Sequence, residues 1–228
     1  MLHVVDRTFT GEARWRQVDG AVFEHCAFDN CLVRRPTDPT ARAVVRNVRF
    51  SDVSHRSCWV NGALIEDTSL VGLKALSDMP LFLSGCAFGR VALSGSISHI
   101  KFNRPLGVGT SVAQQESWDA ANADYYAHLD WALDISKARF TSVIDLGALP
   151  GSLIRRDPET QVLVSRVRLE QADWLALDYG ATVYGMLLSS FRTDSRYDDV
   201  VLVAARGNRK FKEQLAVLTE MRARGLAQ

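Results

Sequence analysis

The chain has 228 residues, 47% of them hydrophobic and 23% charged, with a formal net charge of +1 at pH 7. This composition predicts a folded protein of one or two domains and excludes proteins that bind nucleic acid through a large basic excess. No apolar run approaches the roughly 20 residues that cross a membrane, and Asp6 and Arg7 interrupt the first segment. We therefore expect a cytoplasmic protein with neither a membrane nor a nucleic-acid partner.

Residues 46–71 follow neither the helical nor the strand period. Instead, apolar side chains come in pairs separated by one residue, with a small residue usually first, and the pairs recur every five residues. The pairs are Val48/Phe50, Val53/His55, Cys58/Val60, Ala63/Ile65 and Thr68/Leu70. Residues 21–33 and 81–93 repeat the pattern. Self-similarity at a fixed period is typical of a solenoid.

These residues resemble the repeats of pentapeptide-repeat proteins, from about Ala21 to Phe102, with a last turn at Ala138/Phe140. The resemblance implies a right-handed quadrilateral β-helix in which both residues of each pair point inward. We therefore predict a β-solenoid over residues 1–106. An α+β C-terminal cap over 107–228 would cover one end of the coil.

The four cysteines all occupy the small, inward position of this pattern. They are Cys26, Cys31, Cys58 and Cys86. Free cysteine behaves there as a compact apolar residue. The alternative is a zinc site built from His25, Cys26 and Cys31, but no second pair of ligands completes it. We therefore expect no metal and no other cofactor.

The second half begins with a loop at 107–110 and a helix that follows it. Its apolar face comprises Trp118, Tyr125, Leu129 and Ala132, and the acidic residues Glu116, Asp119 and Asp124 lie largely off that face. Strands are predicted at 162–169 and 200–204, with a helix at 181–191 between them.

The last predicted helix spans residues 209–224. Asn208 would cap its start and Gly225 would end it. Its inward residues would be Phe211, Leu215, Leu218 and Met221.

The polar segment from Arg155 to Gln161 allows two interpretations. Asp157 can cap a helix that starts at Pro158, with Glu159 in its first turn. Alternatively, Arg155 and Arg156 form a fork for a carboxylate or phosphate of a partner. The segment also resembles the C-terminal parts of uncharacterised bacterial pentapeptide-repeat-like proteins, a resemblance that implies no named activity.

The sequence contains no P-loop, no zinc-protease motif and no nucleophile elbow. We therefore expect a non-enzymatic protein-interaction protein, most concretely a bacterial immunity protein that neutralises a toxin by occluding it. The partner would bind at Glu116, Asp119 and Asp124, or at Arg155, Arg156, Asp157 and Glu159. A homodimer through one end of the coil is an alternative.

Two other functions stay open. The family resemblance implies a topoisomerase-protecting mimic of DNA, but residues 1–106 carry a net charge of +3, opposite to that of DNA. A cryptic enzyme would use His55 or His128 with nearby carboxylates. His55 takes an inward position, where a histidine is more often a core residue satisfied by a backbone carbonyl.

Overall fold

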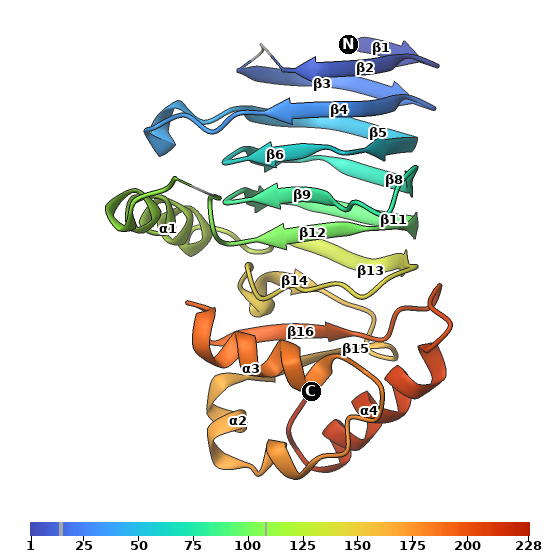
Figure 1. Ribbon diagram of the computed structural model, residues 1–228, viewed down its shortest axis with the longest axis vertical. Helices are drawn as coiled ribbons and strands as arrows, with labels where there is room; N and C mark the ends of the chain where they lie inside the picture. The colour runs from blue at the N-terminus through green and yellow to red at the C-terminus, as the bar shows by residue number, and fades with distance from the viewer. Residues whose placement is uncertain (14–15, 108) are drawn as a thin grey trace.

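The chain folds into one long sheet followed by a smaller helical part, in a computed structural model that describes residues 1–13, 16–107 and 109–228 (Figure 1). The strands of the sheet are β1 (Leu2–Val5), β2 (Thr8–Glu12), β3 (Gln17–Glu24), β4 (Ala27–Val33), β5 (Val44–Arg56), β6 (Trp59–Asn61), β7 (Leu64–Glu66), β8 (Ser69–Ala75), β9 (Leu81–Ser84), β10 (Ala87–Gly89), β11 (Val91–Ile97), β12 (Ile100–Asn103), β13 (Leu133–Phe140) and β14 (Ile154–Arg155). In the described residues these fourteen strands are hydrogen-bonded into a single sheet, and nine lie on its main path, β12-β9-β6-β4-β5-β8-β11-β13-β14.

Residues with a left-handed backbone bend the sheet at regular intervals. Their positive φ angles recur every five residues, at Asn47, Asp52, Ser57, Gly62, Asp67 and Gly72. Glycine, asparagine and aspartate adopt this conformation at the lowest cost. The five-residue spacing of the sequence therefore has a counterpart in the backbone. The first residues of the predicted pairs are buried, as expected, at Ala21, Val48, Val53, Cys58, Ala63 and Thr68.

The predicted right-handed quadrilateral β-helix is nevertheless wrong. A four-sided solenoid divides its strands among separate faces, whereas here the hydrogen bonding continues around the bends. The thirteen-residue strand β5 pairs in parallel with β3, β4, β7 and β8, which joins these strands into one sheet. The sheet curls into a half-barrel, and with its helices the chain is an α/β fold. Neither the expected solenoid with an α+β cap nor the term β-helix describes it.

The number of residues that separates a residue from its partner in the neighbouring strand is not constant either. Leu2 pairs with Ala21, and Ala21 pairs with Val48. The second interval is longer because the loop that carries η1 (Pro39–Ala41) lies within it. Such insertions leave the parallel pairing intact but prevent a uniform repeat.

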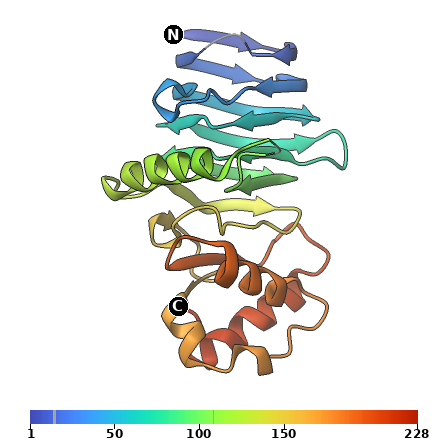
Figure 2. The ribbon, with the colours of Figure 1, turned by 60° about the vertical axis from the view of Figure 1, so that its left-hand side comes forward.

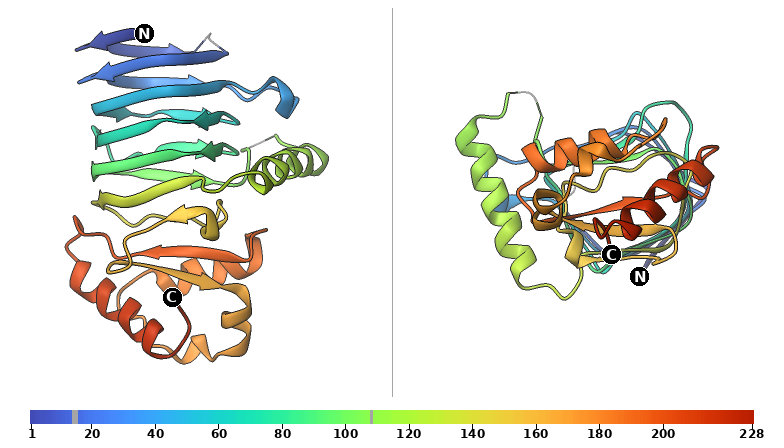
Figure 3. Two further views of the ribbon diagram at one scale, coloured as in Figure 1. Left: turned by 180° about the vertical axis from the view of Figure 1, so that it is seen from behind. Right: turned by 90° about the horizontal axis from the view of Figure 1, so that it is seen from below.

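The C-terminal residues add a two-stranded antiparallel sheet and helices beyond the last strand of the main sheet (Figures 1 and 3). The short helix η2 (Gly151–Leu153) leads into β14, and the elements after it are β15 (Gln161–Ser165), α2 (Arg166–Gln171), η3 (Trp174–Ala176), α3 (Tyr184–Asp194), β16 (Asp199–Val203) and α4 (Phe211–Ala223). The predicted strand at 162–169 stops at Ser165, whose hydroxyl caps α2 by accepting from Arg168 N. The predicted helices at 181–191 and 209–224 are confirmed as α3 and α4, and Gly225 follows α4 with a φ of 72°. The predicted cap at Asn208 is wrong, because α4 starts after Lys210 and the Asn208 side chain accepts from Lys210 N in the turn before the helix.

A continuous apolar core joins the two parts. Leu133 and Ile135 of β13 belong to the same buried cluster as Val201 and Val203 of β16. The expected boundary near residue 106 falls between β12 and α1, and this core extends across it. Apolar packing thus closes the end of the curled sheet where β14 lies.

Helix α1 (Val112–Ala127) lies against the outside of the sheet (Figure 2). Trp118 is fully buried and packs over Gly62, where a Cβ atom would overlap the indole ring. The Tyr125 hydroxyl fits over Gly89 and donates a hydrogen bond of 2.8 Å to Glu66 Oε1. The expected apolar face is therefore confirmed at Trp118, whereas Leu129 and Ala132 lie beyond the end of the helix at Ala127. The two glycines allow the helix to approach the sheet closely.

Candidate functional site

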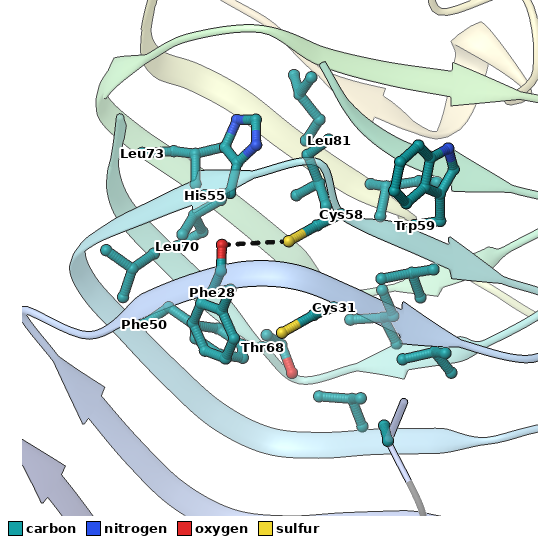
Figure 4. A pocket seen from close by; sticks show the side chains of 18 of the residues that line it. Phe28, Cys31, Phe50, His55, Cys58, Trp59, Thr68, Leu70, Leu73 and Leu81 are labelled. Atoms are coloured by element: carbon teal, nitrogen blue, oxygen red, sulfur yellow. Dashed lines mark hydrogen bonds between the residues drawn. The ribbon is translucent and has the colours of Figure 1, made fainter. Parts of the chain in front are cut away.

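The curled sheet encloses an apolar cavity of about 510 Å³ (Figure 4). Its walls come from most strands of the sheet, from β2 at one end to Leu133 of β13 at the other. The exposed part of the lining is Thr10, Gly11 and Glu12, which belong to β2. The cavity therefore opens at the N-terminal end of the sheet, away from the C-terminal helices.

Four phenylalanines form the wall near this mouth. Phe9 stacks on Phe28 with ring centroids 5.3 Å apart, and Phe23 stacks on Phe50 at 5.2 Å. The parallel register places each ring over the next, since Phe9 pairs with Phe28 and Phe23 with Phe50. Aromatic rings at these distances attract one another beyond their area burial. The stacks give the mouth a firm apolar wall.

His55 is the one imidazole in the described lining of this cavity. Its exposure is only 1%, and neither ring nitrogen has a hydrogen-bond partner among the residues that the structure describes. Burial lowers the pKa of His55 below its ordinary value of 6.5, and nearby His99 adds to this shift. The backbone oxygen of Ser98 lies near enough to the ring to favour its protonated form, which raises the pKa in part, but not in the geometry of a hydrogen bond. The expected satisfied core histidine is therefore buried but not satisfied.

The four cysteines are free, and each thiol donates to a carbonyl oxygen of an adjacent strand. Figure 4 shows one such bond, from Cys58 Sγ to the Phe28 oxygen at 3.2 Å. Cys31 Sγ lies 3.2 Å from the Phe9 oxygen, and it is the half-buried member of the set. Burial raises the pKa of Cys31 to about 11, so its thiol is protonated at neutral pH. The prediction of inward-facing cysteines is confirmed, since the other three are buried and Cys31 lines the cavity.

The segment from Arg155 to Glu159 lies on the C-terminal side of the sheet, and intramolecular contacts hold most of it. The Arg155 guanidinium lies 4.2 Å from the centre of the Trp131 ring. Asp157 Oδ2 accepts hydrogen bonds from Thr160 Oγ1 at 2.7 Å and from Arg206 Nη2 at 2.9 Å. Residues 158–160 form a turn and no helix. Asp157 therefore stabilises a turn, and its neighbour Arg155 is stacked on an indole ring.

Glu159 and Arg155 are the exposed charged residues of this segment. Glu159 is exposed and lies 3.2 Å from Arg206 Nη2, while Arg156 is half-buried. Burial opposes ionisation of Asp157, but the hydrogen bonds from Arg206, Thr160 and the Glu159 backbone lower its pKa below 3.8.

The acidic residues of α1 do not form one surface. Asp119 has a side-chain exposure of 8% and pairs with Arg104 at 2.7 Å and Arg196 at 3.3 Å. Glu116 and Asp124 are exposed, and Asp124 lies 4.0 Å from His128 Nε2. Of the three predicted binding residues, Asp119 therefore points inward, where its ion pairs link α1 to Arg104 in a loop and to Arg196 in the C-terminal part.

The N-terminal end of the sheet has a free edge, which consists of β1 and β2. In the described residues, β1 pairs only with β3 and β2 only with β4. Leu2 and Val5 of β1 are 59% and 42% exposed. Unpaired edge strands with apolar side chains are sites where another chain can add a strand.

Sequence reasoning identified His55 and gave a homodimer through one end of the coil as an alternative, but it missed the cavity and did not place the free edge at β1 and β2. A pattern did point to the cavity: the small residues of several pairs, among them Cys31, Cys58 and Thr68, line it. Small side chains at inward positions leave space inside the sheet, and the larger inward side chains of the same pairs fill only part of it.

No family model, curated protein or solved structure matches this chain. In the part of the chain that the structure describes, no helix is both long and apolar enough to span a membrane.

Proposed function

We propose that this chain is a non-enzymatic protein-interaction protein of the cytoplasm, most concretely an immunity protein that occludes a toxin. The free edge of β1 and β2 carries the proposal. Its backbone groups and the exposed side chains of Leu2 and Val5 offer a partner both hydrogen bonds and apolar contact. The free thiols of the four cysteines are consistent with a reducing compartment.

The opposite end of the sheet does not offer this edge. There β10, β12 and β14 also have one strand partner each among the described residues, but Val201 and Val203 of β16 pack into the core at that end. Of the surfaces expected from the sequence, the acidic helix is divided between solvent and an internal ion pair. The edge is therefore the surface on which a partner gains most without displacing contacts within the chain.

Site-specific photocrosslinking tests this proposal. A benzoylphenylalanine replaces Leu2 in one variant and Met186 in the control, because Met186 is also exposed (66%) but lies on α3. We expect irradiation in the cells that naturally produce the chain to give one discrete adduct with another protein from position 2 and none from position 186. An adduct between two copies would instead identify a homodimer, and equal adducts at both positions would contradict binding at the edge.

The second predicted surface is tested by charge reversal. The double variant Arg155→Glu, Arg156→Glu should weaken a complex held by these cations, because opposite charges then become like charges. If the affinity for the crosslinked partner is unchanged, these two residues are not part of the interface.

A further inference from the structure

We propose that the cavity binds a linear aliphatic alcohol, with His55 as the residue that recognises its hydroxyl group. This site is separate from the free edge proposed for a protein partner. The inference rests on the dimensions of the cavity, on its apolar walls and on the unpaired ring of His55 deep inside it.

The cavity is long and has the volume of a ligand site. Its lining passes from β2 through β4, β6 and β9 to β12, which are successive neighbours in the sheet. At about 4.8 Å per strand, these four steps give a length of roughly 19 Å. The volume of about 510 Å³ lies in the range of roughly 300–1,000 Å³ that small-molecule sites occupy. Such a shape suits an extended chain better than a compact ring system.

The walls select an apolar ligand. The interior lining is made of aliphatic and aromatic side chains, with the thiols of Cys31 and Cys58, the hydroxyl of Thr68, the indole N–H of Trp59 and the imidazole of His55 as its polar groups. The thiols and the Thr68 hydroxyl already donate to backbone oxygens, Thr68 to that of Glu66 at 2.7 Å. His55 is therefore the fully buried polar side chain of this interior with unused capacity for hydrogen bonding, since Trp59 is only half-buried.

His55 lies well inside the cavity. Its backbone pairs with Phe28 of β4 and with Ala75 of β8, which places it two strands from β2 at the mouth. Two strand spacings correspond to roughly 10 Å. In Figure 4 the ring projects from the sheet near Leu73 and Leu81. A ligand must therefore bring its polar group past the phenylalanine stacks to reach it.

The chemistry of the imidazole specifies that polar group. A neutral imidazole has one N–H donor and one lone-pair acceptor, and a hydroxyl group can satisfy either of them. A pure hydrocarbon would leave both nitrogens unpaired. A carboxylate would place a charge in an apolar interior next to a neutral ring, which is costly. An alcohol with an aliphatic tail meets both requirements.

Displacement of a fluorescent apolar dye, N-phenylnaphthylamine, tests the proposal on the full chain. We expect the dye to bind, and decanol to displace it roughly tenfold more tightly than decane, the effect of one buried hydrogen bond. Decanoate should bind more weakly than decanol at neutral pH. His55→Leu should remove the preference for decanol over decane while keeping the apolar walls. His128→Leu, at an exposed histidine on the end of α1, should retain the preference.

Alkylation of Cys31 gives an independent measurement. Because Cys31 lines the cavity and is the half-buried thiol, saturating decanol should slow its reaction with N-ethylmaleimide. The proposal is overturned if neither dye nor decanol binds, if folded His55→Leu still prefers decanol, or if decanol leaves the alkylation rate unchanged. The double variant Leu2→Glu, Val5→Glu separates the two proposals, since it should abolish partner binding at the edge and leave decanol binding intact.

Discussion

Replacing His55 by leucine should make the unliganded protein more stable. His55 buries two ring nitrogens that have no partner among the described residues, within a core that is otherwise apolar. A buried polar group without a hydrogen bond costs about 1–3 kcal/mol, and leucine removes that cost without adding a new polar atom. A binding residue that destabilises the empty protein is typical of a site kept for its ligand.

The magnitude follows from the position of the ring at the cavity. The ring lines free volume, so it is not tightly packed on every side, and we take the lower part of the range, about 1–2 kcal/mol. For a chain of this length, each 1 kcal/mol raises the melting temperature by about 2–4 °C, which gives roughly 2–8 °C for His55→Leu.

The stability difference between His55→Leu and the wild type should also depend on pH. Because the folded pKa of His55 lies below 6.5, the unfolded chain binds a proton first as the solution is acidified. The free energy of unfolding therefore does not depend on His55 protonation well above pH 6.5. It decreases as the pH falls from 6.5 toward the folded pKa of His55, because the unfolded chain then binds the proton more readily. His55→Leu lacks this loss, so its advantage should be larger in mildly acidic than in neutral solution.

Urea unfolding followed by circular dichroism at several pH values measures both effects, with His128→Leu as the control at an exposed histidine. A His55→Leu protein that is less stable than the wild type, or an advantage that shrinks on acidification, would refute the reasoning. Either result would mean that the imidazole makes favourable contacts in the folded protein.

Three further predictions concern the contacts that hold the fold together. Gly62→Ala should cost about 2–4 kcal/mol in urea unfolding, because it strains a left-handed residue and pushes Trp118 off the sheet; an unchanged midpoint would contradict this packing. Asp119→Ala should lower the free energy of unfolding by about 1–3 kcal/mol, because it breaks the ion pairs with Arg104 and Arg196. Glu116→Ala, at an exposed site, should leave it unchanged, and equal effects of the two variants would argue against the ion pairs. Asp157→Asn should lower stability by about 1–2 kcal/mol at neutral pH, because the lowered pKa stabilises the fold while the carboxylate is ionised. The difference should decrease as the pH falls from 3.8 toward the folded pKa of Asp157, and a difference that persists in strong acid would rule out this charge effect.

Local patterns were predictable wherever neighbours in sequence are also neighbours in space. The five-residue spacing identified inward residues such as Val48 and Cys58, and helical periodicity located α3 and α4. Composition and spacing were sufficient there because burial depends on which side of a local bend or helix a residue occupies. The strand at 162–169 was predicted too long, because a cap at Ser165 starts a helix within an apolar stretch.

The roles of charged residues were not predictable, because their partners come from distant parts of the chain. Asp119 had the same appearance in sequence as Glu116 and Asp124, but the fold brings Arg104 and Arg196 to it alone. A carboxylate's role depends on such partners, which periodicity does not reveal.

The amino-acid sequence by itself determined which side chains face the interior and where the later helices lie, since both follow from short-range periodicity. Only the tertiary structure decided that the strands continue around their bends as one curled parallel sheet, because strand pairing joins residues as far apart as Val91 and Leu133. It also decided that small inward residues leave a cavity and that His55 projects into it unpaired. Empty volume and missing partners are properties of the assembled packing, and no segment of the chain carries them alone.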